Sequence, residues 1–190
     1  MIVLMRHGQD DPDWLGGWSD AGLTEEGRRQ AEEAAEKLRR DFPGIRRIYA
    51  SDLPRAWETA EIAAREFGLP VLPVPGFRET NNGRLAGMQK AEAREKYPGI
   101  FFAALDFDEP YPGGESPRAF RDRIEAAWAE FRRDTEELRG DTLLVTHAGV
   151  INVILCHESG IPFTNREMTW PTPHAGIVAV ESTGSTALTS

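Results

Sequence analysis

Two histidines in the chain stand directly after short apolar runs. His7 follows Arg6 and the run Met1–Met5, and His147 follows the run Thr142–Thr146. A neutral imidazole can attack phosphorus as a nucleophile. A guanidinium group binds phosphate oxygens through a rigid fork of donors. These residue types suit chemistry on a dianionic group such as a phosphate ester.

A second arginine and a carboxyl group extend this set. Arg55 falls in the first turn of a predicted helix that starts at Pro54, where the helix dipole favours an anion. Glu79 follows Arg78, and a protonated carboxyl group can donate to a leaving oxygen. Phosphoryl transfer depends mainly on positioning and charge stabilisation, so enough fixed cations can take the place of a metal ion. We therefore expect no metal and no cofactor.

The remaining sequence predicts the elements that must position these residues. Short apolar runs predict five strands: Met1–Met5, Ile45–Ala50, Val71–Val74, Thr142–Thr146 and Ile177–Glu181. Helical spacing of apolar residues, with caps and stops, predicts helices over residues 24–43, 54–68, 88–97, 116–140 and 150–158. Alternating strands and helices indicate an α/β fold, which we predict to be a three-layer α/β/α sandwich with a mostly parallel central sheet.

The order of these elements predicts where the reactive residues meet. Pro73 favours an edge position for its strand, and Ile177–Glu181 is expected to pair with a short strand after Gly184. In such sheets, ligands bind outside the carboxyl ends of the strands. The residues that follow strand ends are Arg6, His7, Arg55, Arg78, Glu79 and His147. We expect them to gather at one edge.

Composition limits the class of protein. The 190 residues are 40% hydrophobic and 28% charged, which is typical of one folded domain covering residues 1–190. The formal net charge of -9 argues against nucleic acid and an anionic membrane as partners. The single cysteine, Cys156, excludes an internal disulfide framework. Without a secretory signal or a bilayer-spanning run, we expect a cytoplasmic protein.

Five motifs in order resemble those of one family. They are LMRHGQD (Leu4–Asp10), LTEEGRRQA (Leu23–Ala31), YASDLPRAWETA (Tyr49–Ala60), GGES (Gly113–Ser116) and THAG (Thr146–Gly149). The chain resembles the histidine phosphatase superfamily in its phosphoglycerate mutase-like branch. The resemblance implies the same three-layer fold and a metal-independent phosphomonoesterase that acts on a small phosphorylated metabolite.

The resemblance also implies roles for single residues. His7 matches the nucleophile that takes the phosphoryl group, and Arg6 and Arg55 match the arginines that clamp phosphate. His147 matches the second histidine, which supports the transferring group. Glu79 matches the acid that protonates the leaving group and later activates water.

Two further matches concern the walls of the pocket. Gln9 and the backbone at Ala148 match positions that line it, although Ala148 replaces the commoner glycine. Asp10 stands where the family usually has Thr or Ser, and Asp13 lies near the place of a missing Asn. Carboxylates beside a dianion repel it. We expect these two either to point outward or to select a cationic or hydroxyl-rich substrate.

Two other functions compete with hydrolysis. Lys90 lies where mutases hold a substrate-binding lysine, which favours a phosphoglycerate mutase. Against this, Asn82 replaces a tyrosine, and the Arg-Arg pair of mutases has no counterpart between Lys96 and Glu115. The third hypothesis is a non-catalytic regulatory protein that binds a phosphate ligand on the same fold.

Some residues are assigned no chemistry. His157 is expected to cap a helix, and His174 is placed outside the site. The stretch Pro98–Glu115 is rich in Pro, Gly and aromatic residues, and we expect a long loop that is a candidate lid.

Overall fold

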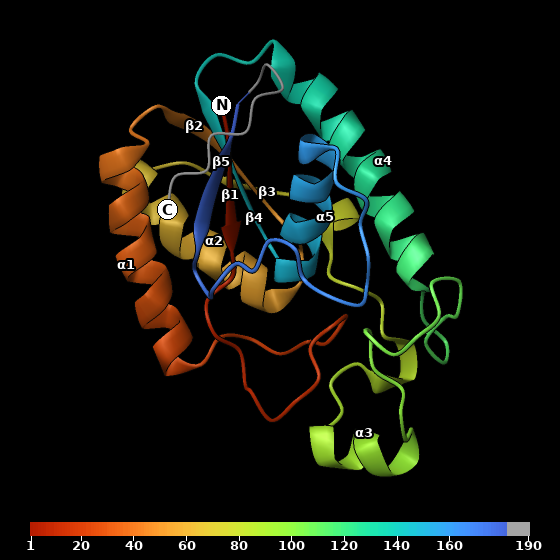
Figure 1. Ribbon diagram of the computed structural model, residues 1–190. Helices are drawn as coiled ribbons and strands as arrows, with labels where there is room; N and C mark the ends of the chain where they lie inside the picture. The colour runs from red at the N-terminus through yellow and green to blue at the C-terminus, as the bar shows by residue number, and fades with distance from the viewer. Residues whose placement is uncertain (182–190) are drawn as a thin grey trace.

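A five-stranded sheet forms the centre of the computed structural model, which describes residues 1–181 (Figure 1). The strands are β1 (Ile2–Arg6), β2 (Ile45–Ala50), β3 (Val71–Pro73), β4 (Asp141–Thr146) and β5 (Ile177–Val180). They lie in the order β3-β2-β4-β1-β5, and only β5 runs antiparallel to its neighbour. This arrangement confirms the predicted mostly parallel sheet, with β3 at an edge.

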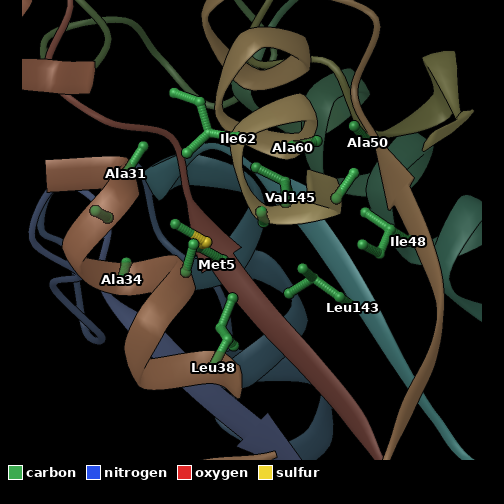
Figure 2. Packing of buried hydrophobic residues seen from close by; sticks show 14 of the residues in the cluster. Met5, Ala31, Ala34, Leu38, Ile48, Ala50, Ala60, Ile62, Leu143 and Val145 are labelled. Carbon is green, nitrogen blue, oxygen red and sulfur yellow. The ribbon is translucent and has the colours of Figure 1, made fainter. Parts of the chain in front are cut away.

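Two pairs of helices cover the two faces of this sheet. Helices α1 (Glu25–Asp41) and α2 (Pro54–Phe67) pack on one face, and α4 (Pro117–Glu136) and α5 (Ala148–Ser159) pack on the other. Side chains alternate along β1, so that Met5 belongs to the first layer and Leu4 to the second. Figure 2 shows the first layer, where Met5 meets Leu38 of α1. The predicted three-layer sandwich is confirmed.

Smaller elements connect β3 to α4. They are two 3₁₀ turns, η1 (Pro75–Phe77) and η2 (Gly83–Leu85), and the short helix α3 (Lys90–Lys96), which lies at the bottom of Figure 1. The stretch 98–115 contains no helix or strand, as predicted. It is anchored because Leu105 and Tyr111 pack with Leu85.

The pairing of β5 with β1 was not predicted, and two helix boundaries differ from the predictions, because α4 ends at Glu136 and α5 begins early. β5 pairs with β1, with Met5 opposite Ile177, whereas the strand predicted after Gly184 lies outside the described residues. Helix α5 begins at Ala148, directly after β4, and therefore two residues earlier than predicted. Within residues 1–181, no helix has both the length and the apolar character needed to cross a membrane.

Two glycines let α1 approach the segment that follows β1. A Cβ atom on Gly8 would lie 2.2 Å from the carbonyl oxygen of Gly27, and one on Gly27 would lie 2.1 Å from the carbonyl oxygen of Gln9. Thr24 caps α1 by accepting from the Gly27 N–H at 3.0 Å, and its own N–H donates to Gln9 O at 2.9 Å. The first turn of α1 is thus fixed against the backbone after β1.

This close approach can be tested by stability. Gly27→Ala should lower the free energy of unfolding by about 1–3 kcal/mol through overpacking, although alanine is otherwise the better helix former. Urea unfolding would show a lower midpoint at constant slope. Glu36→Ala, at an exposed position of the same helix, should change stability by less than about 0.5 kcal/mol. An unchanged midpoint in Gly27→Ala would show that α1 can shift without cost.

Candidate active site

The pairing of β1 with β4 brings two histidines together. Arg6 lies opposite Thr146 in the parallel register, so the next residues, His7 and His147, emerge side by side. The His7 N–H donates to Thr146 O at 2.9 Å, and the two ring centroids lie 5.1 Å apart. Both side chains are buried.

The ring of His7 is held in one tautomer. Its Nδ1 lies 2.6 Å from the carbonyl oxygen of Gly8, which can only accept, so Nδ1 carries the hydrogen. The lone pair is then on Nε2, to which Arg55 Nε donates at 3.3 Å. Burial, and then the positive charge of Arg55, lower the pKa of His7 well below its usual range. His7 is therefore a neutral imidazole with its lone pair facing the guanidinium.

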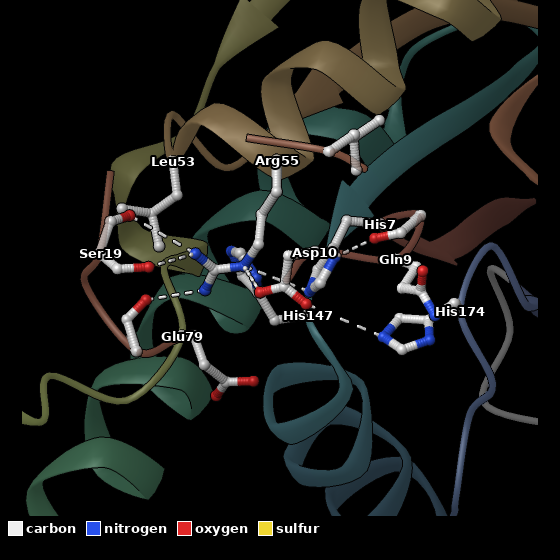
Figure 3. A network of polar contacts seen from close by, with 12 residues as sticks. His7, Gln9, Asp10, Ser19, Leu53, Arg55, Glu79, His147 and His174 are labelled. Atoms are coloured by element: carbon white, nitrogen blue, oxygen red, sulfur yellow. Dashed lines mark hydrogen bonds and ion pairs between the residues drawn. The ribbon is translucent and has the colours of Figure 1, made fainter. Parts of the chain in front are cut away.

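Arg55 is a buried cation in the first turn of α2, only 2% exposed. Its Nη2 donates to Gly17 O at 2.7 Å, and its Nη1 donates to the Ser19 hydroxyl at 3.3 Å (Figure 3). These contacts fix the plane of the group, while Nε faces His7. Such an orientation suits an arginine that binds an anion beside the imidazole.

The second guanidinium belongs to Arg6, at the end of β1. Its Nη1 donates to Thr172 O at 2.7 Å, and its Nη2 lies 2.7 Å from His174 Nε2. Among residues 1–181, its buried Nε has no hydrogen-bond partner. One donor of this fork thus remains available for a ligand.

His147 is supported by Ser51, which follows β2. Its Nε2 lies 2.8 Å from the Ser51 hydroxyl, and its buried Nδ1 has no partner within the described part of the chain. Burial, followed by the charge of Arg55, lowers the pKa of His147 well below its usual range. If the Ser51 hydroxyl donates to Nε2 of His147, the ring hydrogen is on Nδ1, and this N–H is free to bind a ligand.

Glu79 follows the turn η1, and its carboxylate contacts the first turn of helix α5. Its carboxylate accepts from the backbone N–H of Gly149 at 3.1 Å and of Thr80 at 2.9 Å. A Cβ atom on Gly149 would lie 2.5 Å from Glu79 Oε1, so this approach requires glycine. Arg123 and the Trp18 indole both donate to Glu79 O, which holds the backbone in place.

A cavity of about 420 Å³ opens beside Glu79. Much of its wall is apolar and comes from Phe102, Ala103, Tyr111, Phe163 and Met168. The anchored stretch 98–115 therefore supplies one side of this cavity. The backbone of Ala148 also lines it, whereas the Gln9 side chain lies toward His174 (Figure 3) and accepts from the Thr24 hydroxyl at 3.0 Å.

Of the residues expected at the carboxyl edge, the structure brings His7, Arg6, Arg55, His147 and Glu79 around one site. Arg78 is turned aside and pairs with Asp52 at 2.5 Å. His157 lies in the last turn of α5, 3.9 Å from Glu125.

The exclusion of His174 was wrong. Its ring lies 5.8 Å from that of His7, and it contacts Arg6 directly. The reason is the antiparallel pairing of β5 with β1: the start of β5 lies at the carboxyl end of β1, and His174 lies only three residues before that start. Burial lowers the pKa of His174.

The two aspartates of the following loop differ. Asp13 is exposed, as expected for a carboxylate that points outward. Asp10 points inward instead, with Oδ2 3.5 Å from Arg55 Nε and Oδ1 4.0 Å from His174 Nε2. The expectation of an outward orientation therefore fails for Asp10.

Sequence comparisons show the family to which the chain belongs. The model of the histidine phosphatase superfamily (branch 1) matches residues 2–188. A 2,3-bisphosphoglycerate-dependent phosphoglycerate mutase of Parvibaculum lavamentivorans is 31% identical over 157 residues, covering 78% of this chain and 74% of the relative. Phosphoglycerate mutase-like protein 4 of Arabidopsis thaliana is 36% identical over 160 residues, covering 79% and 67%.

Solved structures share the fold. A mycobacterial glucosyl-3-phosphoglycerate phosphatase is 30% identical, with a TM-score of 0.77 over 93% of this chain and 87% of that chain. The alpha-ribazole phosphatase of Shigella flexneri has a TM-score of 0.82 over 99% and 94% at 21% identity, which shows a common fold. With the family match over nearly its whole length, this chain belongs to the histidine phosphatase superfamily, branch 1.

Proposed function

We propose that this chain is a metal-independent phosphomonoesterase that acts through a phosphohistidine on His7. The observation that carries the proposal is the His7 ring itself. Its Nδ1 hydrogen is bound to Gly8 O, and its Nε2 lone pair faces the Arg55 guanidinium. An imidazole in this state can attack phosphorus without first losing a proton.

The reaction would proceed in two displacements. In the first, His7 Nε2 forms a bond to phosphorus, the bond to the leaving oxygen breaks, and protonated Glu79 donates its proton to that oxygen. In the second, Glu79 removes a proton from water, the water oxygen bonds to phosphorus, and the P–N bond breaks to return His7. Arg6, Arg55 and the free Nδ1–H of His147 would stabilise the charge on the phosphoryl oxygens.

The cavity supports hydrolysis over mutase chemistry. A phosphoglycerate carries a carboxylate, but the wall beside Glu79 is largely apolar and also includes Glu167. The arginine in this wall, Arg166, already contacts Ala103 O at 2.7 Å and Asp106 at 3.3 Å. Lys90, the residue that favours a mutase, is exposed at the start of α3. The mutase hypothesis is retained because curated relatives carry that name.

Trapping the intermediate tests the role of His7. Labelled phosphomonoester quenched in alkali should leave label on the wild-type protein, because phosphoramidates resist alkali, and none on His7→Ala. His157→Ala, a change of an exposed histidine at the far end of α5, should retain the label. Label on the His7 variant would refute the assignment. Turnover in the wild type would dispose of the non-catalytic hypothesis.

A second experiment separates hydrolase from mutase. With 3-phosphoglycerate and 2,3-bisphosphoglycerate present, we expect release of phosphate from a screened phosphomonoester but no formation of 2-phosphoglycerate. The rate should be unchanged by EDTA, since Arg6 and Arg55 supply the fixed positive charge. Efficient conversion to 2-phosphoglycerate would establish a mutase. Loss of activity in EDTA that a divalent ion restores would contradict metal independence.

The role of Glu79 should depend on the leaving group. Glu79→Gln should slow formation of the phosphoenzyme from an alkyl phosphate by about 10²–10⁴-fold. The same step with nitrophenyl phosphate should slow far less, because nitrophenolate leaves without a proton. Single-turnover kinetics would measure this step, with Glu66→Gln, an exposed change on α2, as the control. Equal losses for both substrates would indicate that Glu79 only positions the phosphate or the fold.

A further inference from the structure

The carboxylate of Asp10 lies beside the guanidinium nitrogen that faces His7. Its Oδ2 is 3.5 Å from Arg55 Nε, and this same Nε lies 3.3 Å from His7 Nε2, the atom that carries the lone pair. A phosphoryl group attacked by His7 must place an oxygen next to Arg55. Figure 3 shows the Asp10 carboxylate between Arg55 and His174. The carboxylate and the phosphate oxygens must therefore meet.

The backbone keeps Asp10 in this place. Asp10 forms an antiparallel bridge with Leu23, just before α1, and the neighbouring Gln9 O accepts from the Thr24 N–H at 2.9 Å. The loop after His7 also approaches the carboxylate, because a Cβ atom built on Gly16 would lie 3.6 Å from Asp10 Oδ2. The side chain is 21% exposed. Asp10 is thus a mostly covered carboxylate on a fixed segment.

The charged and titratable groups of the site come from five segments of the chain. Arg6 at the end of β1 and Arg55 on α2 are cations, and Asp10 acts on both. Burial favours the neutral form of His7, of His147 after β4 and of His174 before β5. The remaining group is the carboxyl group of Glu79. An uncharged residue at position 10 would raise the formal charge of the site by one unit.

We propose that Asp10 makes this site select the monoanion of a phosphomonoester by accepting a hydrogen bond from its P–OH group. The inference rests on the proposed function. A dianion would bring a bare oxygen against the carboxylate, with no proton between them. A monoanion supplies that proton and carries one negative charge fewer than the dianion. The P–OH proton stays on the phosphoryl group during attack, so Asp10 is a specificity-determining residue.

Selection of the monoanion fixes the direction of the pH dependence. The second ionisation of a phosphomonoester occurs near pH 6, as in phosphoserine. Above that pH, the monoanion fraction falls about tenfold per pH unit, and kcat/KM should fall with it. His7 can still act at the lower pH, because burial holds its pKa well below the usual range.

Sulfate tests the charge preference without turnover, because it is a dianion of phosphate shape at all relevant pH values. Isothermal titration at neutral pH should show at least about tenfold tighter sulfate binding to Asp10→Asn and Asp10→Thr than to wild type. Asp13→Asn removes an exposed carboxylate of the same loop and should bind like wild type. Equal affinity in wild type and both Asp10 variants would mean that the carboxylate turns away from any anion, which would overturn the proposal.

Kinetics supply the second arm. For one alkyl phosphate, the ratio of kcat/KM in Asp10→Asn to that in wild type should rise at least about tenfold between about pH 5 and about pH 8. The ratio removes the pH effects that are common to both proteins. A ratio that is flat with pH would overturn the proposal. If no phosphomonoester is hydrolysed, the proposed function fails, and the sulfate titration still decides whether Asp10 opposes a dianion.

Discussion

Strands β1 and β4 lie side by side and in parallel, with Arg6 opposite Thr146, and the position of every reacting group depends on this pairing. It delivers two imidazoles to one point at the carboxyl edge, inside the protein and away from water. Burial keeps both rings neutral. A neutral ring is what a nucleophile toward phosphorus needs, so the sheet determines the protonation state as well as the position.

Burial of the positive charges requires a second set of contacts. Burying the Arg55 guanidinium would cost free energy if its N–H groups had no partners. The carbonyl of Gly17 and the hydroxyl of Ser19 accept hydrogen bonds from it. Both partners come from the loop after His7, which therefore orients the cation as well as covering it. A chain with a net charge of -9 can hold an anion site because these cations are local and shielded from solvent.

The sequence was sufficient to predict the layers of the fold and most of the residues at the carboxyl edge, because apolar runs and helix caps are local signals. His147 could be placed beside His7 from strand ends alone. His174 could not, because its position depends on the antiparallel pairing of β5 with β1, which no local pattern indicates. The sequence also could not predict that the Asp10 side chain points inward. Asp10 and Asp13 are alike in type, and the bridge from Asp10 to Leu23 is a tertiary contact.

The cavity beside Glu79 is built from two loops that are far apart in the chain. The amide of Asn165 donates to Phe102 O at 2.7 Å and to Leu105 O at 2.9 Å, and so joins the loop after α5 to the stretch before α4. Neither the stretch 98–115 nor residues 160–170 of the loop after α5 carry a histidine or arginine of the phosphate site, and His174 lies further along that loop. Insertions or substitutions in either segment can therefore change the part of the cavity that would hold the alcohol group of the substrate, while the sheet, the nucleophile and its cations stay as they are. In this architecture, the choice of substrate and the capacity for chemistry can evolve separately.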